Sequence, residues 1–167
     1  TEKSIRLLEY LIDASSRGSR DRAYSVIGPY GSGKSAFALL ASTLLSNMTT
    51  PWLDESLRQL KVVSPGLYER LKNECGPDQR GYFPIIVQGD KSALDLALCR
   101  SLFEAITSDE LDTKWVPIEL IDSVHLTLQT LETGINGPTD VVDLYKRAAS
   151  HARAESYKGL LVVADEF

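Results

Sequence analysis

The stretch GPYGSGKS, residues 28–35, places three glycines directly before or beside a lysine and a serine. Glycine loses more conformational freedom on folding than any other residue, so such a cluster indicates a special demand on the backbone. The spacing fits G-x-x-x-x-G-K-[ST] through Gly28, Gly33, Lys34 and Ser35. The flanking sequence decides what this match means.

The segments on either side of the glycines predict a strand and a helix. AYSVIG, residues 23–28, is short, apolar and partly β-branched, which predicts a buried strand. KSAFALLASTLLSN, residues 34–47, is rich in alanine and leucine and apolar on most faces, which predicts a buried helix. A strand, a glycine-rich turn and a helix in this order are the context of the Walker A motif, or P-loop.

The chemistry of a P-loop is phosphate binding. Backbone N–H groups curl around phosphate oxygens, and Gly31 and Gly33 leave room for that approach. The unpaired amides of the following helix face the same phosphates with the positive end of its dipole. We expect Lys34 to reach the β- and γ-phosphates of ATP and the Ser35 hydroxyl to ligate Mg²⁺. The predicted nucleotide-binding residues are Gly28, Pro29, Tyr30, Gly31, Ser32, Gly33, Lys34, Ser35 and Ala36.

A second motif, LLVVADEF, covers residues 160–167. Its apolar run without alternation predicts a strand covered on both faces, and the two acids that follow match the Walker B pattern with a second carboxylate. Asp165 is expected to hold Mg²⁺ together with Ser35. Glu166 is expected to accept a proton from the water that attacks the γ-phosphate, so Glu166 and Lys34 are the predicted catalytic residues. The motifs reinforce each other because the carboxyl ends of parallel strands meet at one sheet edge.

Periodic apolar residues and turn signals predict the remaining elements. YFPIIVQG (82–89) predicts another strand. Expected N-caps are Ser92 and either Thr139 or Asp140, and Pro117 and Gly134 are expected to bound one helix. The predicted helices cover 4–14, two segments within 48–80, 93–106, 117–134 and 140–158. Alternating strands and helices predict an α/β sandwich with a mainly parallel sheet.

Composition restricts the class of protein. The chain has 167 residues, 43% hydrophobic and 25% charged, as in one soluble globular domain. Its net charge of −5 gives no support for a generally basic nucleic-acid surface. We find no apolar run long enough for a membrane span and no signal peptide. Cys75 and Cys99 lack metal-ligand and CxxC spacing, so we expect free thiols and a cytoplasmic location.

The pairing of GPYGSGKS with LLVVADEF resembles the additional-strand, catalytic-glutamate class of P-loop NTPases, closest to AAA+ and STAND-like ATPases. The helix at 4–14 before the P-loop strand also resembles AAA+ modules, and the chain is similar to large multidomain bacterial ATPases, some from anti-phage defence systems. The resemblance implies Mg²⁺-dependent ATP hydrolysis that drives conformational change or assembly of a larger protein. It also implies a homo-oligomer or a larger complex as the working form.

The class has parts that this sequence does not contain. Lys34 and Asp165 lie further apart than a compact core needs, so 48–80 (a helical insertion) and 108–140 are expected insertions. A sensor-1 strand, a fifth strand, a helical lid and an arginine finger would follow Walker B. We therefore expect 1–167 to be the N-terminal part of an ATPase domain, inactive by itself. In the implied sheet order 5-1-4-3-2, strand 4 would fill a gap about one strand wide between strands 1 and 3.

Other functions remain as alternatives. A GTPase would carry N/T-K-x-D and an ABC ATPase would carry LSGGQ before Walker B, and neither motif occurs here. A small-molecule kinase usually lacks an acid at the place of Glu166. A nucleotide-gated switch or scaffold with little turnover fits the same motifs. A DNA-associated motor would use Arg17, Arg20 and Arg22, although three arginines in a connector are more often a solvated surface.

Several further residues have a simpler structural interpretation. His125 and His151 fall on predicted helices without a cysteine or acid at ligand spacing, which disfavours a metal site. Tyr30 fits either packing near the nucleotide or packing on the loop surface. Asp90 and Lys91 follow the second strand, where the start of a helix explains them as well as a site does.

Overall fold

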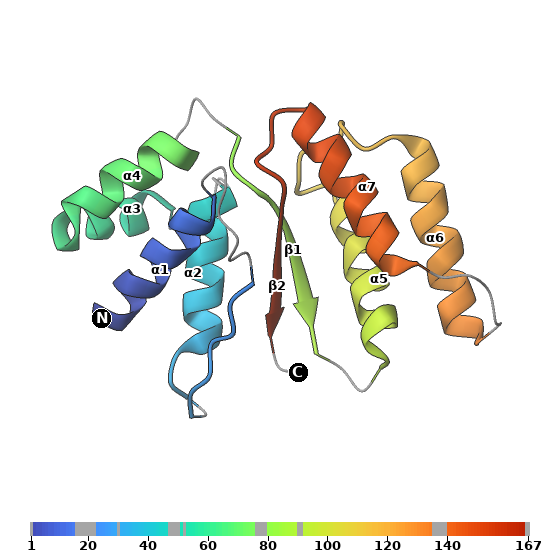
Figure 1. The fold of residues 1–167 in the computed structure, drawn as a ribbon, viewed down its shortest axis with the longest axis horizontal. Coiled ribbons are helices and arrows are strands. Elements are labelled where there is room, and N and C mark those ends of the chain that lie inside the picture. Colours follow the sequence, from blue (N-terminus) through green and yellow to red (C-terminus); the bar gives the residue numbers. More distant parts are fainter. Residues whose placement is uncertain are drawn as a thin grey trace. The chain divides into compact units, whose positions relative to one another are not determined.

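The computed structural model describes residues 2–15, 23–29, 31–46, 51, 53–75, 80–89, 92–134 and 140–165. Within these residues the fold is mostly helical α/β with a two-stranded parallel sheet (Figure 1). The elements are α1 (Glu2–Ser15), α2 (Lys34–Ser46), α3 (Leu53–Val63), α4 (Pro65–Cys75), β1 (Phe83–Gln88), α5 (Leu94–Ile106), α6 (Ile118–Thr133), α7 (Val141–Ala154) and β2 (Leu160–Asp165). The α/β class and the parallel pairing are confirmed, whereas a P-loop fold is not identified.

The chain divides into two compact units, Thr1–Tyr82 and Phe83–Phe167. In the first unit α1, α2, α3 and α4 pack on one another. The helix predicted at 4–14 is confirmed as α1, and its Leu8 and Ile12 lie on one face and are buried. The two predicted helices within 48–80 are α3 and α4. α4 begins at Pro65, and the first residue of a helix makes no intrahelical N–H bond, so the missing N–H of proline costs nothing there.

The helix α2 is buried along half of its length. Ala41–Ser46 are buried, whereas the residues from Lys34 to Leu40 are exposed or half-buried. The prediction of a helix is therefore confirmed, and the prediction that it is buried throughout is wrong. Apolar composition sets how much surface a helix can bury, but neighbouring elements decide which part is covered.

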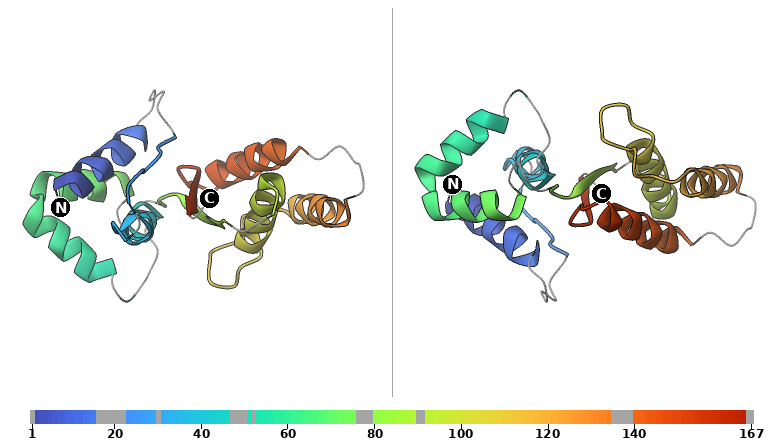
Figure 2. Two further views of the ribbon diagram at one scale, coloured as in Figure 1. Left: turned by 90° about the horizontal axis from the view of Figure 1, so that it is seen from below. Right: turned by 90° about the horizontal axis from the view of Figure 1, so that it is seen from above.

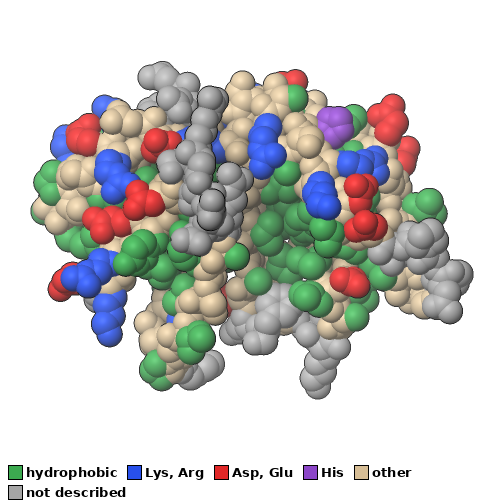
Figure 3. All heavy atoms as spheres, viewed as in Figure 1, with side chains coloured by type: hydrophobic (Ala, Val, Ile, Leu, Met, Phe, Trp, Pro, Cys, Tyr) green, Lys and Arg blue, Asp and Glu red, His purple; other side chains and the backbone are tan. Residues whose placement is uncertain are grey.

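The predicted strand at 23–28 is absent from the described structure. Residues 23–29 form no strand, and Tyr24, Val26 and Ile27 are exposed, Ile27 by 92%. Figure 3 shows hydrophobic side chains at the surface near the loop end of α2. The reason is that β-branched composition favours a strand only where a neighbouring strand supplies the ladder and a packed face. The sheet within the described residues consists of β1 and β2.

The two strands pair in parallel, from Phe83 opposite Leu160 to Gln88 opposite Asp165. Both lie where the sequence predicts a strand. The inward side chains of β1, Phe83, Ile85 and Val87, are at most 1% exposed. By contrast, no residue of β2 is fully buried and Val162 is 43% exposed. The prediction that this strand is covered on both faces is wrong, because its apolar run is only partly covered by helices.

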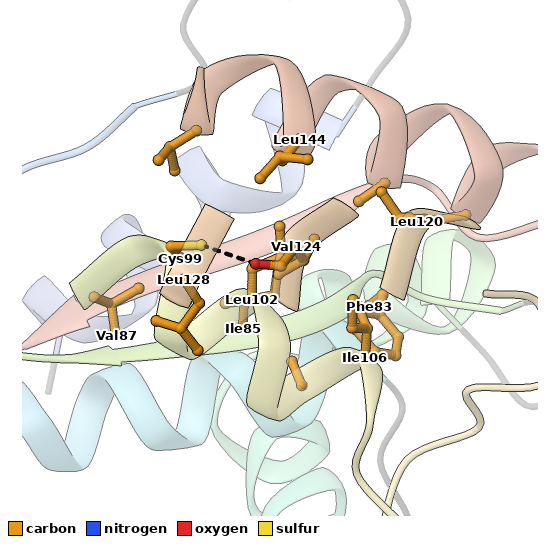
Figure 4. Close-up of a cluster of buried hydrophobic side chains, with 14 of the residues drawn as sticks. Phe83, Ile85, Val87, Cys99, Leu102, Ile106, Leu120, Val124, Leu128 and Leu144 are labelled. Atoms are coloured by element: carbon orange, nitrogen blue, oxygen red, sulfur yellow. Dashed lines mark hydrogen bonds between the residues drawn. The ribbon is translucent and has the colours of Figure 1, made fainter. Parts of the chain in front are cut away.

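The core of the second unit lies between β1 and the helices. The helices α5 and α7 lie against the strands, and α6 packs on the side of α5 and α7 away from the sheet (Figure 2). Figure 4 shows Ile85, Leu102, Val124 and Leu144 converging from β1, α5, α6 and α7. Cys99 lies in the same cluster, and its Sγ donates to Val124 O at 3.6 Å. Four elements thus share one apolar core.

The N-terminal ends of two helices test the predicted caps. Asp140 caps α7 by accepting the Asp143 N–H at 2.9 Å, as predicted for one of two candidates, while Thr139 lies outside the described residues. Ser92 is not the N-cap of α5. That position is Ala93, which makes no side-chain cap hydrogen bond, so α5 begins one residue later than the serine would set it.

The C-terminal ends of two helices differ in how well the sequence predicts them. α6 ends before Gly134, whose φ of +66° is left-handed, as predicted. α7 was expected to reach residue 158 but ends at Ala154. Ser156 has a φ of +70°, and Tyr157 N–H donates to Ala152 O at 3.0 Å. This Schellman-type ending satisfies the last carbonyls without the glycine that usually marks it.

Two further findings concern the cysteines and the apolar character of the described helices. Cys75 and Cys99 form no disulfide, as the sequence predicts, and both side chains are buried. Among the described helices, none combines the length and the apolar character needed to span a bilayer.

Candidate functional site

The candidate loop, Gly28–Ser35, turns on two glycines in the left-handed region. Gly31 has a φ of +73° and Gly33 a φ of +83°, conformations that other L-residues rarely adopt. Nothing lies within 4 Å of the point where a Cβ would stand at either glycine. The backbone conformation therefore requires glycine here, and the space beside both residues is open. Ser32 N–H donates to Pro29 O at 3.2 Å and closes the intervening turn.

The helix α2 starts directly after the second of these glycines. Its first backbone hydrogen bond in the described structure runs from Phe37 N–H to Gly33 O at 2.9 Å. The preceding N–H groups, those of Lys34, Ser35 and Ala36, have no intrahelical acceptor and carry the positive end of the helix dipole. Ser35 and Ala36 are exposed. An accessible helix start of this kind attracts anions, and phosphates above all.

The ammonium group of Lys34 folds back over the loop. Its Nζ donates to Gly28 O and to Pro29 O, both at 3.1 Å. A lysine ammonium has three donors, so two are used by the loop carbonyls and one is left for a further acceptor. The positive charge of Lys34 is thereby held beside the turn that leads into the free amides at the start of α2. The sequence could not predict that Lys34 bonds to these two carbonyls, because every residue has a backbone oxygen and the sequence does not show which of them will accept.

The structure brings most of the predicted nucleotide-binding residues into one exposed turn. Gly28, Pro29, Gly31, Ser32, Gly33, Ser35 and Ala36 are exposed, and Lys34 is half-buried. Tyr30, predicted to bind nucleotide, lies outside the described residues. The exposed position of the loop follows from the burial of α2 at its opposite end.

The acidic residues of the second motif lie in the second unit. Asp165 is the last residue of β2 and is half-buried, and its backbone oxygen accepts the Gly89 N–H at 2.9 Å. It therefore stands at the carboxyl end of a parallel strand, as predicted. Glu166, the predicted base, lies outside the described residues, as do Asp90 and Lys91.

The two histidines lie on helices, as expected. His125 is exposed on α6, stacks on the Phe103 ring with 5.3 Å between centroids, and is 3.3 Å from the Gln129 amide nitrogen. His151 is exposed near the end of α7. In the described part of the chain, no group of three or more histidine, cysteine or acidic side chains could hold a metal ion.

Comparison of the chain with models of protein families, with curated proteins and with solved structures finds no match. The resemblance to P-loop ATPases therefore rests on the two sequence motifs and their flanking segments.

Proposed function

We propose that this protein binds ATP with Mg²⁺ at Gly28–Ser35 and hydrolyses it. The observation that carries the proposal is the loop itself, in which left-handed Gly31 and Gly33 lead into α2 while Lys34 Nζ lies over the loop carbonyls. A flexible turn that joins two elements by accident has no need for two positive φ angles and a lysine folded onto its backbone. Backbone N–H groups in a turn with left-handed residues, followed by a helix start, form an anion-binding concavity of the kind that holds phosphates.

Each residue of the loop has a defined task in this proposal. The free amides at the start of α2 donate to phosphate oxygens. Lys34 offers its third donor to the β- and γ-phosphates, and its charge offsets theirs. The Ser35 hydroxyl would ligate Mg²⁺, and the Asp165 carboxylate is the second ligand that the motifs predict; hydroxyl and carboxylate oxygens are the ligands Mg²⁺ prefers. When bound, Mg²⁺ stabilises the negative charge that develops on the transferred phosphoryl group.

Glu166 is the proposed general base. Its carboxylate would take a proton from the water that attacks the γ-phosphate, leaving ADP and inorganic phosphate as products. We further propose that hydrolysis drives a conformational change or the assembly of a larger complex, in which copies of this chain or other proteins take part.

A P-loop NTPase sandwich is the finer fold that we propose. In the order 5-1-4-3-2, strands 2 and 3 are neighbours and parallel. The parallel pairing of β1 with β2 supports this order, with β1 as strand 2 and β2 as strand 3.

Lys34→Ala tests the proposed function. The substitution removes the charge beside the loop and spares the buried half of α2, so we expect the Kd for Mg-ATP to rise about 10- to 100-fold, as for a lost charge-assisted hydrogen bond. The full-length protein should be titrated with labelled ATP by equilibrium fluorescence. Lys72→Ala, at an exposed lysine of α4 in the same unit, is the matched control. If Lys34→Ala binds ATP as tightly as the wild type, the loop is not the nucleotide site.

A further inference from the structure

The loop-bearing helix α2 is held at the end opposite to the loop. Its buried residues are confined to Ala41–Ser46, whereas Lys34 and the residues up to Leu40 are exposed or half-buried. With a rise of 1.5 Å per residue, the helix start lies about 17 Å from Leu45. The position of the loop therefore depends on how firmly the buried end is held.

Gly81 touches that buried end more closely than any other residue type would permit. A Cβ at this position would stand 2.9 Å from the Ser46 carbonyl carbon, 3.1 Å from the Leu45 carbonyl carbon and closer still to the Leu45 oxygen. These are backbone atoms, which cannot rotate away. Gly81 has no left-handed φ, so space rather than conformation requires a glycine.

The same close approach makes a hydrogen bond. Tyr82 N–H donates to Leu45 O at 3.0 Å and so satisfies one of the carbonyls that a helix end leaves without a partner. The glycine and the amide that follows it together hold the last turn of α2 against the chain that enters β1. We call this contact, formed by Gly81, Tyr82 and Leu45, the α2 anchor.

We propose that Gly81 is a positioning residue for the nucleotide loop, an inference that rests on the proposed function. A side chain at residue 81 would push the last turn of α2 away and break the Tyr82–Leu45 bond. A tilt of about 5° at the anchored end moves the helix start by about 1.5 Å over this length. A displacement of about 1 Å in a binding or catalytic group is enough to lower activity about 100-fold.

Gly81→Ala in the full-length protein is the test. We expect the Kd for Mg-ATP to rise about tenfold or more, and the hydrogen-bonded amides of Ser32 and Phe37 to exchange with solvent faster in the absence of nucleotide. Leu67→Ala is the control, because it removes a buried side chain of α4 in the same unit and leaves the three anchor residues unchanged. Both variants are measured at a temperature where circular dichroism shows them folded. Leu67→Ala should lower the melting temperature and leave the Kd within about twofold of the wild type.

The outcomes separate the positioning role from the proposed function. The positioning role is overturned if Gly81→Ala keeps wild-type affinity and unchanged exchange of the Ser32 and Phe37 amides, or if Leu67→Ala loses affinity equally. A wild-type protein that binds no ATP overturns the proposed function, whereas faster exchange of the Ser32 and Phe37 amides in Gly81→Ala would still support the anchor.

A measurement on the wild type covers the case in which Gly81→Ala does not fold. Because coupling between two sites is reciprocal, ATP at the loop should slow exchange of the Tyr82 amide. The Tyr68 amide, which donates to Ser64 O at 3.0 Å in α4, serves as the reference and should not change. Equal exchange of the Tyr82 amide with and without bound ATP would overturn the positioning role.

Discussion

In the proposed reaction, the carboxylate of Glu166 is required for hydrolysis but not for nucleotide binding. Glu166→Gln keeps the size and polarity of the side chain but cannot accept a proton. We expect phosphate release to fall about 100-fold or more while ATP affinity stays close to that of the wild type. Steady-state hydrolysis and equilibrium binding should be measured side by side, with Glu104→Gln on the exposed surface of α5 as control. An equal loss of binding and turnover would instead assign Glu166 a metal-holding or structural role.

Cys99 makes the stability of the protein depend on alkaline pH. Burial, and then the charge of Glu132, raises the pKa of its thiol from 9.0 to about 11. As pH rises through this window the unfolded chain loses the thiol proton while the folded chain keeps it, so the free energy of unfolding falls between pH 9 and about 11. Burial also raises the pKa of Tyr145, which adds a fall of the same sign at higher pH.

Cys99→Ala isolates the contribution of this thiol. The variant should be less stable at neutral pH because it leaves a cavity, but its free energy of unfolding should fall less steeply between pH 9 and about 11. Urea denaturation across this range measures both slopes. Identical slopes in the variant and the wild type would show that the thiol does not titrate in this way.

At the scale of elements, the end of α7 offers a direct test of backbone strain. Ser156 holds a φ of +70°, which costs a residue with a side chain about 1–2 kcal/mol, whereas glycine avoids the clash and gives up about 0.5–1 kcal/mol in backbone entropy. We expect Ser156→Gly to stabilise the protein by about 0.5–1 kcal/mol in thermal or urea unfolding. Ser150→Gly, within α7, should destabilise it instead. A loss of stability in Ser156→Gly would contradict the strain.

The strands show how an element depends on its partners. Residues 160–165 and 83–88 pair with each other and form β2 and β1, whereas 23–29 have comparable apolar and β-branched composition and form no strand. The difference is the ladder, since a strand without a neighbour gains neither paired amides nor a packed face. Local composition therefore predicts where a strand is possible, and pairing decides where one forms.

At the scale of the whole molecule, the motifs fall into different compact units. The glycine loop belongs to Thr1–Tyr82 and Asp165 to Phe83–Phe167, and the second unit has its own core around Val124. The strand-wide gap expected between 23–28 and 160–165 concerns segments of both units and stays a prediction. In the described sheet, residues 160–165 pair with β1.

The sequence by itself determined where the helices lie, where strands are possible and where the glycine loop falls. These follow from local physics: apolar residues and turn signals around α1 and α6, the Asp140 cap, and the cluster of glycines directly before α2. Each depends on residues within a few positions of one another. Such patterns can therefore be recognised before any tertiary contact is known.

Only the tertiary structure decided which surfaces are covered and which backbone groups are paired. The half-burial of α2, the partial exposure of β2 and the lack of a strand at 23–29 depend on distant parts of the chain. So does the contact of Gly81 with Leu45, where the glycine is required by a carbonyl far away in the sequence. Steric fit and hydrogen bonding act between atoms that folding brings together, and for that reason they leave no periodic pattern in the sequence.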